Sequence, residues 1–133
     1  WEKALALEGN SGPYLQYAHA RVCSLLDKYA DQVPGRDPLG NALLLNEPVE
    51  KTLALQLMQF PAAVLRAAEA CKPSVLADYL FGLSQTYSSF YQRSPVLKAD
   101  AAVRDSRIRL CALVAQVLAE GLGLLGMRAP RRI

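Results

Sequence analysis

Prolines divide this chain into helical segments, and their placement is the feature that most restricts its fold. Inside a helix a proline removes a backbone hydrogen bond and clashes with the preceding turn, whereas in the first turn it loses only an amide that would be unpaired anyway. Four of the eight prolines fall at or just inside predicted helix starts, namely Pro13, Pro48, Pro61 and Pro73. The chain is therefore expected to form several helices with proline-marked boundaries.

Apolar residues recur in these segments at the 3.6-residue period of an α-helix. The predicted helices run from Ser11-Gly12-Pro13 to about Tyr29, from a cap at Asn46 to Phe60, over 61–70, from Pro73 to Ser94, and from near Arg104 to a stop at Gly126. The stretch ADQVPGRDPLGNALLLN after Tyr29 is predicted to be an exposed loop. No segment shows sustained alternation of β-branched residues, so the sequence predicts an all-α fold, a single bundle of about five helices.

Length and composition indicate one domain over residues 1–133. With 52% hydrophobic and 20% charged residues, the chain resembles a soluble globular protein, and no apolar run approaches the roughly 20 residues of a membrane helix. The opening WEKALALEGN lacks the features of a secretory signal. Its lack of an initiator methionine suggests a fragment, and a cytoplasmic location is expected.

The three cysteines and the charges give weaker indications. Cys23, Cys71 and Cys111 lie 48 and 40 residues apart, which argues against a disulfide framework or a local zinc site and favours buried free thiols. Residues 1–103 hold nine Lys and Arg against ten Asp and Glu, whereas residues 104–133 hold six against two. This asymmetry favours a polyanionic partner only weakly.

The stretch GPYLQYAHAR, Gly12 to Arg21, is the most informative for function. On a helix, Tyr14, Tyr17 and Arg21 stand at i, i+3 and i+7 along the edge of the apolar face, where they are half buried and half reachable. Two tyrosines and an arginine in that position could hold an unstacked RNA base. Taken alone, the stripe is more often core packing with an arginine that reaches for solvent.

Other candidate groups favour structural roles. His19 and Cys23 stand four residues apart, but two ligands make an incomplete metal site, so no metal is expected. Tyr87, Phe90 and Tyr91 are interpreted as helix packing. Three arginines crowd the start of the last helix, where the helix dipole disfavours cations, and Asp100 or Asp105 could compensate them. Those arginines are Arg104, Arg107 and Arg109.

Four stretches in order closely resemble the C-terminal anticodon-binding domain of arginyl-tRNA synthetases, the DALR type. They are GNSGPYLQYAHARVCSLL, NEPVEKTLALQLMQFPAAVLRAAE, ADYLFGLSQTYSSFYQRSPVL and RIRLCALVAQVLAEGLGLLGMRAP. The resemblance implies a helical bundle that grips the anticodon stem and loop, while a separate class I catalytic domain activates arginine with ATP. That domain is absent here, since the chain has no HxGH-like or KMSK-like motif.

The same resemblance implies which residues meet RNA. Tyr14, Tyr17 and Arg21 would face the anticodon loop, and Tyr79, in the matching YLFGLSQTYSSFY helix, is a further candidate. Arginine codons carry G in the middle, so the tRNA presents a middle cytosine whose N3 and O2 accept hydrogen bonds that Arg21 could donate. The tyrosines would stack, and Lys and Arg of the last helix or tail would attract phosphates.

The resemblance also sets the expected partners and cofactors. The partners would be the tRNA for arginine and the catalytic domain of the same synthetase, without membrane or DNA; ATP and magnesium would belong only to the missing catalytic domain. Family members commonly end in a methionine near the anticodon, whereas this chain ends in Pro130-Arg131-Arg132-Ile133. Either Ile133 replaces that contact or the extra arginine reinforces phosphate binding. The competing hypothesis is a helical protein-interaction module without RNA specificity.

Overall fold

The computed structural model describes the backbone of residues 2–133 and the side chains of residues 12–133. Its α-helices are α1 (Glu2–Gln32), α2 (Pro48–Met58), α3 (Phe60–Ala70), α4 (Pro73–Arg93) and α5 (Ala101–Leu124), with a 3-10 turn, η1 (Pro38–Gly40), after α1. Residues 2–133 contain no strand. The prediction of an all-α fold of about five helices is confirmed.

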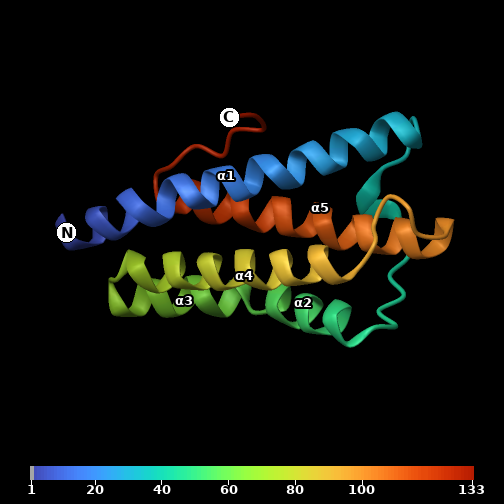
Figure 1. Ribbon diagram of the computed structural model, residues 1–133. Coiled ribbons are helices and arrows are strands. Elements are labelled where there is room, and N and C mark those ends of the chain that lie inside the picture. Colours follow the sequence, from blue (N-terminus) through green and yellow to red (C-terminus); the bar gives the residue numbers. More distant parts are fainter. Residues whose placement is uncertain (1) are drawn as a thin grey trace.

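The helices form three layers (Figure 1). The long helices α1 and α5 lie side by side, α4 packs against both, and α2 and α3 follow one another along the other side of α4. The core lies between them, and its largest fully buried side chains include Tyr29 of α1, Phe90 of α4 and Ile108 of α5. None of the described helices is both long enough and apolar enough to cross a membrane.

The predicted start of the first helix is wrong. Pro13 lies inside α1, which begins at Glu2 and extends past Tyr29 to Gln32. Its ring fixes φ near the helical value, so the cost is one missing hydrogen bond and local crowding. The segment EKALALE before it consists of good helix formers, the intervening GNSG does not, and the helix runs through both. Tyr14, Tyr17 and Arg21 therefore lie along a continuous helix rather than at its entry.

The other boundaries follow the sequence closely. Pro48, Pro61 and Pro73 stand in the first turns of α2, α3 and α4. The cap of α2 is Glu47 rather than Asn46, because the Glu50 side chain accepts a hydrogen bond from the Glu47 N–H at 2.9 Å and completes a capping box.

The last helix starts three residues earlier than predicted, at Ala101, and ends as predicted before Gly126. Gly126 has φ +77°, and the next amide, of Met127, donates to the Leu122 carbonyl at 2.8 Å. This is the left-handed stop that glycine adopts most readily.

The predicted exposed loop between α1 and α2 is instead fastened to α5 at its centre. Asn41 is buried, and its amide donates to the Tyr29 hydroxyl at 3.2 Å and to the Asp105 carbonyl at 3.0 Å. Arg109 donates to the Asn41 carbonyl at 2.8 Å. The turn chemistry was visible in the sequence, but Asp105 and Arg109 belong to a helix more than 60 residues away.

The arginines of α5 are held within the fold. Arg104 Nε donates a hydrogen bond to the Asp105 carboxylate at 3.0 Å. Asp105 is one of the two anions predicted to compensate these arginines. Arg107 donates to the Pro95 carbonyl at 2.6 Å, and its Nε lies 3.6 Å from the carboxylate of buried Glu50. With Arg109 bound to Asn41, most of the positive charge predicted to attract RNA has intramolecular partners.

The cysteine prediction is right for two of three positions. Cys23 and Cys111 are buried free thiols, whereas Cys71 is exposed. Burial raises the pKa of Cys111 to about 12, so this thiol stays protonated and packs as a small apolar group. Cys71 ends α3 in a left-handed conformation at φ 51°.

Candidate nucleic-acid interface

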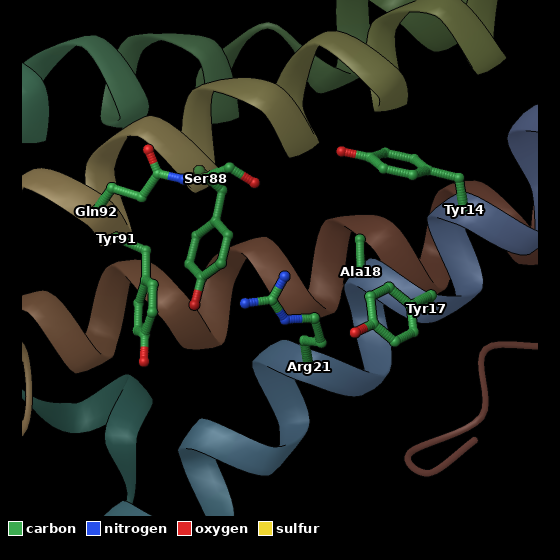
Figure 2. Close-up of a pocket in the computed structure, with 8 residues that line it drawn as sticks. Tyr14, Tyr17, Ala18, Arg21, Ser88, Tyr91 and Gln92 are labelled. Atoms are coloured by element: carbon green, nitrogen blue, oxygen red, sulfur yellow. The ribbon is translucent and has the colours of Figure 1, made fainter.

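A pocket lined by tyrosines and one arginine opens between α1 and α4 (Figure 2). It has a volume of about 90 Å³. Its walls are Tyr14, Tyr17, Ala18 and Arg21 from α1 and Tyr87, Ser88, Tyr91 and Gln92 from α4. We call this pocket the aromatic slot.

Three of the four predicted site residues meet in the aromatic slot. Tyr14 and Tyr17 are 38% and 52% exposed, and Arg21 is exposed as well. The Arg21 guanidinium carbon lies 5.7 Å from the centre of the Tyr17 ring, a cation–π contact that holds both side chains at the mouth. The Tyr14 ring lies 5.2 Å from that of Phe81 on α4. The stripe is thus presented outward, with solvent access between its members.

The wall on α4 was missed by sequence reasoning. Tyr87, Phe90 and Tyr91 were interpreted together as packing, and this is correct for Phe90, which is fully buried. Tyr91 is 44% exposed, and its ring lies 6.1 Å from that of Tyr87 at an interplanar angle of 26°. Burial raises the pKa of Tyr87, so its hydroxyl stays protonated. The polar neighbours Ser88 and Gln92 were the available indication that this face is not sealed.

Tyr79 does not join the other three. It is only 8% exposed, its hydroxyl donates to the Gln56 carbonyl of α2 at 2.6 Å, and its ring stacks on that of Phe60 at 6.0 Å. Burial raises the pKa of its hydroxyl to about 12. Tyr79 therefore faces the α2 and α3 layer and packs there, and its role as an RNA contact stays a prediction.

The C-terminal tail, residues 127–133, returns along α1 (Figure 1). Gln16 donates to the Arg128 carbonyl at 2.9 Å, and His19 Nδ1 lies 3.0 Å from the Pro130 carbonyl. Gly12 allows the start of the tail to approach, since the Met127 side chain occupies the place that a Cβ would take. This close approach, rather than a helix start, explains the glycine.

His19 and Cys23 show no metal-site geometry. The Cys23 thiol lies 3.6 Å from His19 Nε2, while Nδ1 of the same ring faces the Pro130 carbonyl. Among the described residues no three His, Cys, Asp or Glu side chains are grouped closely enough to hold an ion. Burial, partly offset by Arg131, raises the pKa of the Cys23 thiol. The pair is a packed contact at the base of the tail.

Comparison with known proteins places this architecture in a class. The family model described as the DALR anticodon binding domain matches residues 15–133. The arginine–tRNA ligases of Cellvibrio japonicus and Thermobifida fusca are 46% and 44% identical to the whole chain. The arginyl-tRNA synthetase of Thermus thermophilus superposes on 92% of the chain with a TM-score of 0.78 and 40% identity.

The all-α bundle and these matches together define the class, a helical anticodon-binding domain. The chain belongs to the DALR anticodon-binding domain family. It spans only 23% of each of the two ligases and 21% of the Thermus protein. The family resemblance predicted from the four sequence stretches is confirmed.

Proposed function

We propose that this chain is the tRNA-binding domain of an arginine–tRNA ligase and that the aromatic slot receives an unstacked base of the anticodon loop. The observation that carries the proposal is the convergence of Tyr14, Tyr17, Arg21, Tyr87 and Tyr91, from two helices, around one solvent-open pocket. Stacking on aromatic rings contributes roughly 1 to 3 kcal/mol per base and tolerates any base.

Arg21 would supply selectivity among bases. A middle cytosine offers N3 and O2 as acceptors, and a guanidinium carries donors only. Ser88 and Gln92 add oxygens that could accept from the N4 amine on the opposite wall. Tyrosine rings would therefore set affinity, while Arg21 and the polar residues of α4 would set which base is preferred.

The wider assignment also belongs to this proposal. Residues 1–133 would act as one domain of a longer cytoplasmic synthetase whose catalytic domain uses arginine, ATP and magnesium. The chain alone would bind tRNA for arginine without charging it. The alternative is a helical module that docks a protein helix on the same aromatic edge, and it predicts no dependence on RNA sequence.

Slot variants test the proposal by fluorescence anisotropy with two anticodon stem-loop RNAs that differ only at the middle base. Tyr17→Leu and Tyr91→Leu should each weaken binding of both RNAs about 10-fold, because each removes a stacking surface worth on the order of 1 to 3 kcal/mol. Arg21→Gln should instead bring the two affinities together, because it removes the donors that distinguish the bases.

Tyr79→Phe is the matched control, since it alters a tyrosine of α4 that faces away from the aromatic slot. It should bind both RNAs like the unaltered chain. Equal affinity of the unaltered chain for the two RNAs at moderate salt would contradict base recognition and favour the protein-docking alternative.

A further inference from the structure

A second, larger hollow adjoins the aromatic slot, between α1 and the C-terminal tail. Its volume is about 500 Å³. It is lined by Tyr17, Ala20, Arg21, Ser24, Asp27, Lys28 and Asp31 of α1 and by Arg131, Arg132 and Ile133 of the tail. We call it the tail groove. Tyr17 and Arg21 line both hollows, so a strand whose base enters the slot would leave it over these two side chains and into the groove.

The charges in the tail groove are unequally matched. Arg131 is paired with Asp27 at 2.7 Å, which leaves three cations, Arg21, Lys28 and Arg132, against the single carboxylate of Asp31. Within residues 12–133, neither Lys28 nor Arg132 has an ion pair or a side-chain hydrogen bond, and both are exposed. The surface therefore has two long cationic side chains available for an anion.

The wall that carries Arg132 is ordered before any ligand arrives. The tail is held on α1 at three successive points by Gln16, His19 and Asp27, which contact Arg128, Pro130 and Arg131 respectively. A wall already fixed in place loses little conformational entropy when a ligand binds. The Arg131–Asp27 pair thus positions the tail, and it leaves Arg132 as the tail arginine of the groove without an ion pair.

The arginines of α5 offer the RNA backbone less. Arg104, Arg107 and Arg109 of α5 are bound to Asp105, Glu50, Pro95 and Asn41, so their charge is already neutralised or hydrogen-bonded inside the fold. An anion that follows a base out of the aromatic slot meets Lys28 and Arg132 instead.

We propose that the tail groove binds the sugar–phosphate backbone of the RNA strand next to the base held in the aromatic slot, with Lys28 and Arg132 as its phosphate ligands. Each cation would contact phosphate oxygens. Such contacts add affinity, but they do not distinguish one RNA sequence from another. This inference rests on the proposed function for the identity of the strand. It adds Lys28, and it assigns the tail's part in phosphate binding to Arg132 rather than to Arg131.

Salt dependence measures these contacts directly. Each neutralised phosphate contributes about 0.7 to the slope of log K against log salt for a single strand. Arg132→Gln and Lys28→Gln should each reduce the slope for the anticodon stem-loop by about that amount. They should weaken binding equally for the two RNAs that differ at the middle base. Asp31→Asn, which removes the unpaired carboxylate of the groove, should tighten binding of both RNAs.

Arg66→Gln is the matched control, because Arg66 is an exposed arginine on α3, away from the groove. If Arg132→Gln and Lys28→Gln give the same salt slope as Arg66→Gln, the groove proposal is overturned. Base discrimination by Arg21 could still stand in that case. If instead the slope falls while the two RNAs bind equally, the groove proposal is supported and the base-recognition proposal fails.

Discussion

Glu50→Gln is expected to lower the free energy of unfolding by about 3 to 5 kcal/mol, because it leaves a buried guanidinium without its counter-charge. Glu50 is only 2% exposed, and its carboxylate lies 3.6 Å from Arg107 Nε. Arg107 Nε has no hydrogen-bond partner of its own, so the neighbouring charge is what offsets its burial. The side-chain NH2 of glutamine would face the Arg107 Nε–H. Two hydrogen-bond donors would then meet where a carboxylate and a guanidinium now attract each other.

Urea unfolding followed by circular dichroism would measure the loss. Glu120→Gln is the control, since it neutralises an exposed glutamate of α5, and it should change the free energy of unfolding by less than about 0.5 kcal/mol. Arg107→Met should cost about as much as Glu50→Gln, and the double variant should cost less than the sum of the two. A loss for Glu50→Gln as small as that of the control would show that the pair does not stabilise the fold.

The Glu50–Arg107 pair matters to the site because of where it joins the layers. It ties the first turn of α2 to α5, while α2 also packs along α4. The position of α4 between these helices brings Tyr87 and Tyr91 opposite the stripe of α1.

The sequence identified the half of the aromatic slot that lies on one helix. Tyr14, Tyr17 and Arg21 share a face because of helical spacing alone, and that spacing holds wherever the helix begins, so the error at Pro13 did not affect it. The opposite wall depends on which face of α4 turns toward α1. That is set by packing against α5 and α3, which no local pattern reports.

The separation of Tyr79 from the other three predicted site residues has the same origin. At 100° per residue, Tyr87 and Tyr91 lie about 80° and 120° around α4 from Tyr79. These angles are enough to turn Tyr79 toward Gln56 and Phe60 while the other two line the aromatic slot. A position on α4 is therefore not enough to place a tyrosine in the aromatic slot.

The number of basic residues after residue 103 also overstates the positive charge that the surface offers. Six of the chain's fifteen basic residues fall after residue 103, but Arg104, Arg107 and Arg109 are engaged by acceptors from the connector, α2 and α5. Composition reports how much charge a segment carries, and the fold decides how much of it faces solvent. Of the basic residues after residue 103, the tail groove retains only Arg131 and Arg132.

Asp105→Asn is expected to lower the free energy of unfolding by about 2 to 3 kcal/mol, because Asp105 joins the end of α1 to α5 through charged hydrogen bonds. Its carboxylate accepts from the Tyr29 hydroxyl at 2.9 Å and from Arg104 Nε at 3.0 Å, and Arg36 lies at 3.4 Å. Tyr29 is completely buried, so this contact fixes the rotation of α1 and with it the direction of the Tyr14–Tyr17–Arg21 stripe.

The effect of Asp105→Asn should depend on pH in one direction. Burial raises the pKa of Asp105, but hydrogen bonds from Arg104 and Tyr29 and the charges of Arg104 and Arg36 outweigh it and hold the pKa below the usual 3.8. Because the folded pKa is the lower one, the stabilisation is complete above the unfolded pKa and is lost as the pH falls through the folded pKa. Urea unfolding at a series of acidic pH values should show the native chain and Asp105→Asn converge there. Asp78→Asn, at an exposed position of α4, should have the same free energy of unfolding as the native chain at every pH. If the free energies of the native chain and Asp105→Asn differ by the same amount at every pH, the carboxylate charge is not what holds α1 in place.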